Sequence, residues 1–143
     1  MDSIKNLLQV AKSCIQGMEQ ASGEVLYSAM ETLQPSQIYL LGLNPGGNPE
    51  LHANETIENS LSKLPSKVTN NYLHDSWAKF QPGEAPLQKR VVGLLKALGY
   101  DPGSVPASNL IFRRTLGAND LDFSGLSPTL GPTEKFGFGL MGL

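Results

Sequence analysis

The chain has 143 residues, of which 40% are apolar and 17% are charged, and its formal net charge is −2. This composition is typical of a globular protein, and no apolar run reaches the ~18 residues that a membrane span requires. The small negative charge excludes a general attraction to nucleic acid, so binding of that kind needs a local basic patch.

Two further features of the sequence bear on the class of protein. The single cysteine, Cys14, excludes an internal disulfide and a metal site built from several cysteines. The N-terminus lacks the basic-then-apolar pattern of a signal peptide. We therefore expect one cytoplasmic domain over residues 1–143, with no membrane contact and no bound metal.

The first 35 residues contain two apolar patterns of helical period. Residues 3–18 carry apolar side chains at three- and four-residue spacing, which predicts an amphipathic helix. A second helix is predicted after Ser22, a residue type that caps helix N-termini. Its expected buried stripe consists of Val25, Leu26, Ala29, Met30 and Leu33.

Residues 38–49 follow, and the other features are arranged around them. Ile38–Leu41 is a short apolar run bounded by turn residues, which predicts a strand buried on both faces, as in a parallel sheet. The strand leads into a turn of glycines and prolines that carries one amide side chain, Asn44. Open α/β sheets bind their ligands at this carboxyl edge, so Asn44 is a candidate ligand-binding residue.

The next part of the chain is polar and then aromatic. A short helix is predicted after Asn54 from the spacing of Ile57, Leu61 and Leu64. Residues 70–83 follow with no clear period and contain Tyr72, Trp77 and Phe80. A long irregular connection after a sheet-edge loop is uncommon unless it lines a site, so we expect these residues to contribute to one.

The clearest predicted helix is Pro86–Gly99, with proline in its first turn and glycine as its C-terminal cap. Its expected apolar face consists of Leu87, Val91, Leu94, Leu95 and Leu98. A turn then leads to a second strand over Ala107–Phe112. The order strand, helix, strand predicts a βαβ unit with parallel strands and a right-handed crossover. We therefore expect a three-layer α/β/α fold with a central parallel sheet, followed by an irregular tail over residues 120–143.

Parallel strands deliver their ends to one edge of the sheet, so Asn44 is expected to share that edge with Arg113 and Arg114, with Asn109 just below. Three interpretations of this edge remain open. The loop after the first strand is a phosphate cradle, although it lacks the lysine and the glycine spacing of known phosphate loops. Alternatively, it is a structural turn in an interaction module. In the third interpretation, the two amides bind a heterocycle.

The third interpretation is supported by a resemblance. Residues 42–46, Gly-Leu-Asn-Pro-Gly after an apolar strand, resemble the Gly-x-Asn-Pro-Gly motif of the uracil-DNA glycosylase superfamily. The nearest branches are the mismatch-specific uracil and thymine-DNA glycosylases. The likeness continues through the helix at Leu87–Leu98 and ends with Ser108–Thr115, which looks like the family's second strand with its embedded asparagine. It covers residues 35–116 and implies a uracil-DNA glycosylase-like fold.

The resemblance implies an activity in DNA base-excision repair. Such enzymes flip a deaminated or mismatched base out of DNA and hydrolyse its N-glycosidic bond, here without a cofactor. The motif asparagine, Asn44, is expected to hold the attacking water, and Asn109 to form hydrogen bonds with the flipped base. The other residues expected around the substrate are Gly42, Leu43, Pro45 and Gly46.

The remaining implied contacts are to the base and to the DNA backbone. A ring from the connecting segment, Phe80 or Trp77, is expected to stack on the flipped base. Arg113 and Arg114 are expected to contact phosphates.

The resemblance to the family ends after the second strand. The family carries another site motif and a DNA-inserting loop further along the chain, and nothing in residues 116–143 is similar to them. We therefore expect a truncated or tail-altered member of the family. The alternative function is that of a catalytically inactive member that acts as a binding or interaction protein. A sheet that lacks its last strands leaves an open edge, through which a homo-oligomer is expected to form.

Overall fold

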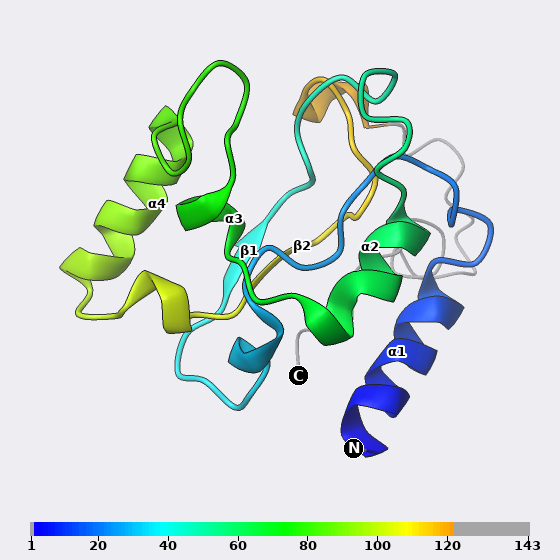
Figure 1. Ribbon diagram of the computed structural model, residues 1–143, viewed down its shortest axis with the longest axis horizontal. Coiled ribbons are helices and arrows are strands. Elements are labelled where there is room, and N and C mark those ends of the chain that lie inside the picture. Colours follow the sequence, from blue (N-terminus) through cyan, green and yellow to red (C-terminus); the bar gives the residue numbers. More distant parts are fainter. Residues whose placement is uncertain (1, 122–143) are drawn as a thin grey trace. The chain divides into compact units, whose positions relative to one another are not determined.

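The computed structural model describes residues 2–121 and shows a mixed α/β fold (Figure 1). The α-helices of this part are α1 (Asp2–Cys14), α2 (Ile57–Lys63), α3 (Asn71–His74) and α4 (Pro86–Ala97). The strands are β1 (Leu40–Gly42) and β2 (Ala107–Asn109). Four short 3₁₀ helices are η1 (Met30–Thr32), η2 (Leu64–Ser66), η3 (Pro102–Ser104) and η4 (Ala118–Asp120). None of the helices between residues 2 and 121 combines the length and apolar character needed to cross a membrane.

The chain divides into two compact units. Unit 1 is formed by Met1–Val25, Leu41–Pro65 and Ser108–Leu143, and unit 2 by Leu26–Leu40 and Ser66–Ala107. Both strands cross this division, because their first residues belong to unit 2 and the others to unit 1. Of the predicted irregular tail, residues 120–143, all but the first two positions lie outside the described residues.

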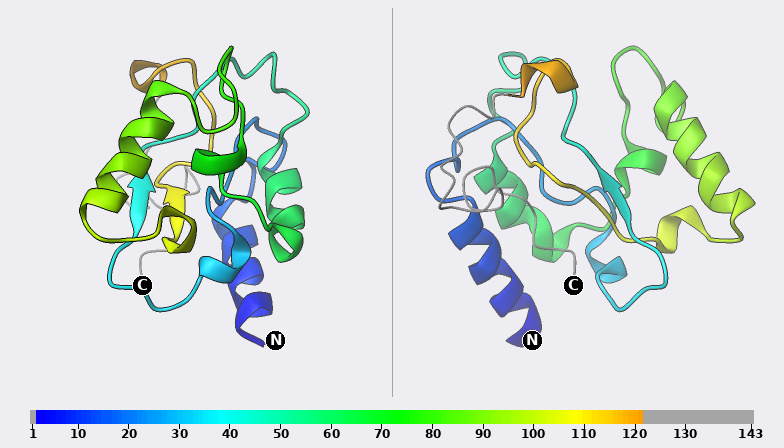
Figure 2. Two further views of the ribbon diagram at one scale, coloured as in Figure 1. Left: turned by 60° about the vertical axis from the view of Figure 1, so that its left-hand side comes forward. Right: turned by 180° about the vertical axis from the view of Figure 1, so that it is seen from behind.

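The two strands pair in parallel, as predicted (Figure 2). The Leu40 N–H donates to the Pro106 carbonyl at 2.9 Å, and the Leu110 N–H donates to the Gly42 carbonyl at 2.8 Å, so both strands advance in the same direction. The prediction of a strand buried on both faces is wrong, because the Leu41 side chain is 50% exposed. The side chains of a strand point alternately to its two faces, so the exposure of Leu41 means that the described residues leave one face of β1 partly uncovered.

The second predicted helix does not form, and this prediction is also wrong. Residues 22–28 instead form isolated bridges and bends beside the second strand: Gly23 bridges Arg113 in antiparallel fashion, and the Tyr27 N–H donates to the Ala107 carbonyl at 2.8 Å. A side chain at Gly23 would overlap a backbone carbonyl of the neighbouring chain segment. Burial is continuous rather than striped, and it covers Val25, Leu26, Tyr27, Ser28 and Ala29.

In unit 1, α1 packs against α2 (Figure 1). The first predicted helix is confirmed, although it ends at Cys14 and Ile15 is buried just beyond it. The short helix α2 is confirmed as well, and Ile57 and Leu61 are buried within it. Its cap is Thr56 rather than Asn54, because the Thr56 hydroxyl accepts the Asn59 N–H at 3.1 Å.

In unit 2, α4 confirms the clearest predicted helix, which begins at Pro86 and is followed by Gly99 at a φ of +83°. Its predicted apolar face is only partly correct. The side chains of Leu87, Leu94 and Leu98 are more than half exposed, whereas Gln88 and Leu95 are buried. The buried face of α4 is set by a polar residue. The Gln88 amide donates to one carbonyl in α3 and to another just after it, so the side of the helix that carries Gln88 faces inward.

Candidate functional site

Asn44 lies two residues after β1, in unit 1, with its side chain half-buried. Its Nδ2 donates to the Pro45 carbonyl at 3.1 Å, the Arg113 carbonyl at 3.2 Å and the Thr115 Oγ1 at 2.8 Å. The Thr115 hydroxyl donates its own hydrogen to the Gly117 carbonyl at 2.8 Å, so it must accept from Asn44. These acceptors fix the amide orientation.

The other end of this amide is its oxygen. Because the amino group faces the three acceptors, Oδ1 points away from them, and no residue between 2 and 121 donates to it. Asn44 therefore presents a rigidly oriented hydrogen-bond acceptor. It can position a water molecule, but as an amide it is too weak a base to remove a proton from one.

The pairing between the two strands becomes irregular near Asn44, and this irregularity places the groups that orient its amide. The N–H groups of Leu110 and Ile111 donate to two consecutive carbonyls of the first strand, at 2.8 and 2.9 Å. Pairing resumes further on, where Gly46 bridges Thr115 in parallel. Irregular pairing of this kind redirects side chains and is common next to functional sites. Here it places the Arg113 carbonyl and the Thr115 hydroxyl beside Asn44.

Asn109 is the last residue of β2 and also belongs to unit 1. Its side chain is 2% exposed, and its Nδ2 is the single buried side-chain nitrogen or oxygen in the described residues that lacks a hydrogen-bond partner. A side chain at Gly42 would overlap the Asn109 Oδ1, so glycine leaves this amide in place and a larger residue would displace it. An unpaired buried donor costs about 1–3 kcal/mol, which a ligand acceptor would offset.

The two predicted phosphate contacts differ in their surroundings. Arg113 is exposed, whereas Arg114 is buried at 8% exposure. The Arg114 guanidinium donates to the Ser22 Oγ at 3.2 Å, the Gly46 carbonyl at 2.6 Å and the Glu55 Oε2 at 2.9 Å. Its donors thus hold the loop that follows Asn44 against the second strand, while Arg113 stays available to an external anion.

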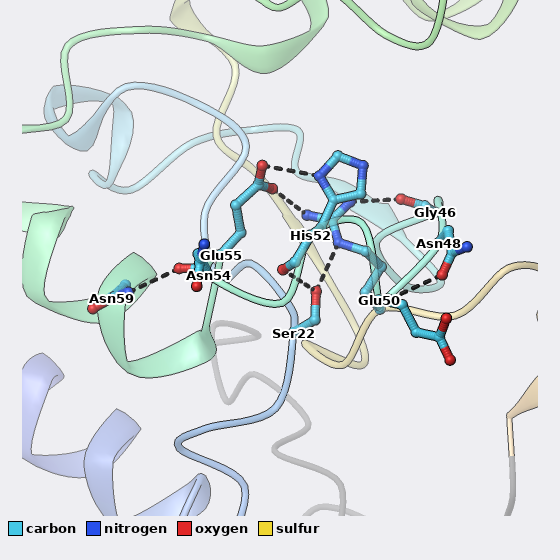
Figure 3. A network of polar contacts seen from close by, with 9 residues as sticks. Ser22, Gly46, Asn48, Glu50, His52, Asn54, Glu55 and Asn59 are labelled. Atoms are coloured by element: carbon cyan, nitrogen blue, oxygen red, sulfur yellow. Dashed lines mark hydrogen bonds and ion pairs between the residues drawn. The ribbon is translucent and has the colours of Figure 1, made fainter.

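A histidine that the sequence interpretation did not select joins this network (Figure 3). The His52 Nδ1 lies 2.9 Å from the Glu55 Oε1, and the Ser22 hydroxyl donates to the His52 carbonyl at 2.9 Å. A side chain at Gly47, whose φ is +111°, would approach both the His52 ring and the Arg114 guanidinium. The spacing of His52 and Glu55, three residues apart in a loop, was the only signal of this contact in the sequence.

A pocket of about 390 Å³ opens in unit 1. Its walls include the cations Arg113 and Arg114, the hydroxyl-bearing Ser22 and Thr115, and one carboxylate, Asp120. Asn44 and Asn109 are not among its lining residues. The exposed Arg113 can therefore meet an anionic group in this pocket, and the two amides lie outside its lining.

The remaining predicted site residues divide between the units. In unit 1, Leu43 is 46% exposed, Pro45 is buried and Gly46 is exposed. In unit 2, the Trp77 ring makes edge contacts with the rings of Tyr27 and Tyr72, at centroid distances of 6.2 and 5.4 Å. The Phe80 ring is half-buried, and the Lys79 ammonium lies 6.0 Å from its centroid.

Within residues 2–121, no three histidine, cysteine, aspartate or glutamate side chains cluster closely enough to hold a metal ion. Comparisons with protein-family models, with curated proteins and with solved structures found no match.

Proposed function

We propose that this protein recognises a deaminated or mismatched base in DNA and hydrolyses the N-glycosidic bond of that base. The proposal includes a finer fold assignment, a three-layer α/β/α fold of the uracil-DNA glycosylase type. Two adjacent parallel strands of its central sheet lie within the described residues. It rests on the resemblance of residues 42–46 and 108–115 to motifs of that superfamily and on the environment of Asn44.

The observation that carries the proposal is the orientation of the Asn44 amide. Three acceptors hold its amino group, and its oxygen is left as an acceptor. A water molecule that donates to this oxygen is fixed in place with a lone pair available for attack on C1′ of the sugar. Such positioning is the contribution that an amide can make to hydrolysis.

The reaction then needs few protein groups. The water oxygen bonds to C1′ while the bond from C1′ to the base nitrogen breaks, and the bonding electron pair leaves with the base. The proton released by the water passes to solvent or to the departing base. Because Asn44 is no strong base, the rate depends on stabilising the base anion, and the unpaired Asn109 N–H is the donor in unit 1 suited to a carbonyl oxygen of that base.

Only one of the two predicted arginines has a role in this proposal. Arg113 is the proposed phosphate contact, because it is exposed while the donors of Arg114 are bonded within the protein. The proposal is confined to unit 1 and assigns no role to Phe80 and Trp77, the two aromatic candidates for stacking on the base, which belong to unit 2.

A base-release assay tests this function. The protein is incubated with labelled duplex and single-stranded oligonucleotides that carry uracil, hypoxanthine or a mismatched thymine, and alkali then cuts the abasic product. We expect release from at least one of these substrates, and a loss of about a hundredfold or more in Asn44→Ala. Asn54→Ala removes an exposed amide from the same segment and should leave the rate unchanged. Release that persists undiminished in Asn44→Ala would remove this residue from the mechanism.

The burial of Asn109 favours a second candidate, a protein that binds DNA without cutting it. At 2% exposure, the amide meets a base only after the surrounding chain has moved. The same oligonucleotides distinguish the two functions: salt-dependent binding with no base release on any substrate supports the second candidate. In that case Arg113→Ala should reduce the slope of log affinity against log salt by about one.

A further inference from the structure

We propose that the Nε2 nitrogen of His52 is a nucleophilic site that accepts a phosphoryl group from a small phosphoryl donor. The inference rests on four residues of unit 1, namely Gly47, His52, Glu55 and Arg114. None of them has a role in the proposed function, so either proposal can fail without the other.

Both the backbone and the ring of His52 are held in place. Its N–H donates to the Asn48 carbonyl at 3.2 Å, and its carbonyl accepts the Ser22 hydroxyl at 2.9 Å (Figure 3). The ring Nδ1 lies 2.9 Å from the Glu55 Oε1. Glu55 is held in turn, because its Oε2 accepts an N–H of Arg114 at 2.9 Å. The imidazole is therefore oriented by a carboxylate that an arginine positions.

The contact with Glu55 decides which nitrogen of the ring is reactive. An ionised carboxylate only accepts hydrogen bonds, so the Nδ1 of His52 carries a proton. In the neutral ring the lone pair then lies on Nε2, and no residue between 2 and 121 bonds to that nitrogen. A carboxylate at one ring nitrogen fixes the tautomer in which the other nitrogen acts as a base or nucleophile.

The space beside Nε2 is open because residue 47 is glycine. A Cβ at Gly47 would stand 3.5 Å from the His52 Nε2 and 3.5 Å from the Arg114 Nη1, so both nitrogens border the same space. Gly47 is exposed and the His52 side chain is 39% exposed, so a small molecule can reach it. The guanidinium charge favours an anionic reactant there, which is why a phosphoryl group suits the site better than a neutral acyl group.

The reaction is a single phosphoryl transfer. The Nε2 lone pair forms a bond to phosphorus while the bond from phosphorus to the leaving group breaks, and the leaving group takes that electron pair. With phosphoramidate as the donor, the leaving group is ammonia. The ring gains a positive charge, and its Nδ1 proton stays hydrogen-bonded to the Glu55 carboxylate, which stabilises that charge. Ser22 is not the nucleophile, since its hydroxyl faces the His52 carbonyl rather than the ring.

The chain has a second histidine, and it provides an internal control. The His74 Nδ1 accepts the Asn70 N–H at 2.9 Å, so the neutral ring of His74 carries its proton on Nε2. His74 is exposed, so accessibility does not favour His52. The two histidines are therefore expected to be opposite tautomers, with a free Nε2 lone pair in His52 alone.

Nitrogen-15 NMR of the full chain tests the tautomers at about pH 8, where an ordinary imidazole is neutral. We expect the Nδ1–H form for His52 and the Nε2–H form for His74. His74→Gln assigns the signals, because it removes one set. The Nε2–H form at His52 would overturn the proposal.

Phosphoramidate labelling tests the reaction. Phosphorus NMR identifies the phosphohistidine isomers, and mass spectrometry of peptides kept at alkaline pH locates them. We expect the Nε2 isomer at His52, formed about tenfold or more faster than any product at His74. Glu55→Gln should lose most of this difference. Glu50→Gln should keep it, because it removes an exposed carboxylate of the same loop that points away from the ring (Figure 3).

Three results of the labelling would each overturn the proposal: equal rates at the two histidines, the Nδ1 isomer at His52, or no product at His52. Circular dichroism checks that Glu55→Gln is folded. The comparison of His52 with His74 is made in the wild-type chain, so it decides the matter even if that variant does not fold.

Discussion

Gln88 at the start of α4 and Asn109 at the end of β2 are both buried amides, yet their surroundings differ. The Gln88 Nε2 donates to the carbonyls of Asn71 and Asp75, each at 2.8 Å, and its Oε1 accepts the Ala85 N–H at 2.9 Å. The Asn109 Nδ2 has no partner among the described residues. One amide is fully used by the fold, and the other leaves a donor for which the fold provides no acceptor.

The difference separates a structural role from a candidate binding role. Buried polar groups are almost always hydrogen-bonded, so each exception needs an explanation. For Asn109 the explanation that we favour is a ligand, the departing base of the proposed reaction. Substitutions that remove a satisfied group should therefore cost stability, and the removal of the unsatisfied one should not.

The largest expected effect is that of Gln88→Leu. The substitution removes the Gln88 partner of the Asn71 carbonyl and of the Ala85 N–H, while the Asp75 carbonyl keeps the Gly83 N–H, so we expect a loss of about 2–3 kcal/mol in the free energy of unfolding. Urea denaturation followed by circular dichroism measures it. Lys96→Leu, an exposed change in the same helix, is the control. Equal stability of Gln88→Leu and the wild type would contradict the role assigned to this amide.

Arg114→Met should have the next largest effect, about 2 kcal/mol, because it removes three donors from the Ser22 hydroxyl, the Gly46 carbonyl and the Glu55 carboxylate. The loss is limited because Glu55 is 58% exposed and is solvated when unpaired. Arg113→Met tests the contrast and should change stability by less than about 0.5 kcal/mol, since this side chain is exposed. The same denaturation measurement reports both variants, and similar losses in the two would contradict the assignment.

Gly42→Ala should destabilise by about 1–2 kcal/mol, because its methyl group would overlap the Asn109 side chain. The double variant Gly42→Ala with Asn109→Ala creates the missing space, so its cost should be smaller than the sum of the two single costs. A double-mutant cycle measures this coupling. Strict additivity would show that the two positions do not meet.

The smallest expected change in stability is that of Asn109→Leu. The substitution removes an unpaired donor and keeps a side chain of similar size, so we expect a shift within about 1 kcal/mol. Binding to the preferred oligonucleotide should nevertheless weaken by about tenfold or more. A loss of stability above about 2 kcal/mol would instead identify Asn109 as a structural residue.

The sequence predicted the elements that local signals determine. The helix α4 has proline at its start and glycine after its end, and the first strand falls at an apolar run bounded by turn residues. Residues 22–28 have a helical spacing of apolar residues, but they form bridges and bends instead of a helix, and Gly23 lies against a carbonyl of the chain segment about 90 residues later in the sequence. A contact at that separation leaves no local pattern.

The same limit applies to the site. The position of Asn44 after a strand was predicted, but the direction of its oxygen depends on Arg113 and Thr115, about 70 residues further along the chain. The burial of Arg114 depends on Ser22 and Glu55 in two separate segments, so adjacent arginines could not be told apart from the sequence.

The tight fit of Gly42 against Asn109 has an evolutionary consequence. The two positions, 67 residues apart in the chain, are coupled, since a side chain at position 42 displaces the Asn109 amide or favours a smaller residue at position 109. An alignment of homologues should therefore show the two columns changing together. A lineage that has replaced this glycine should also carry a shifted or substituted Asn109, with a changed contact to whatever that amide holds.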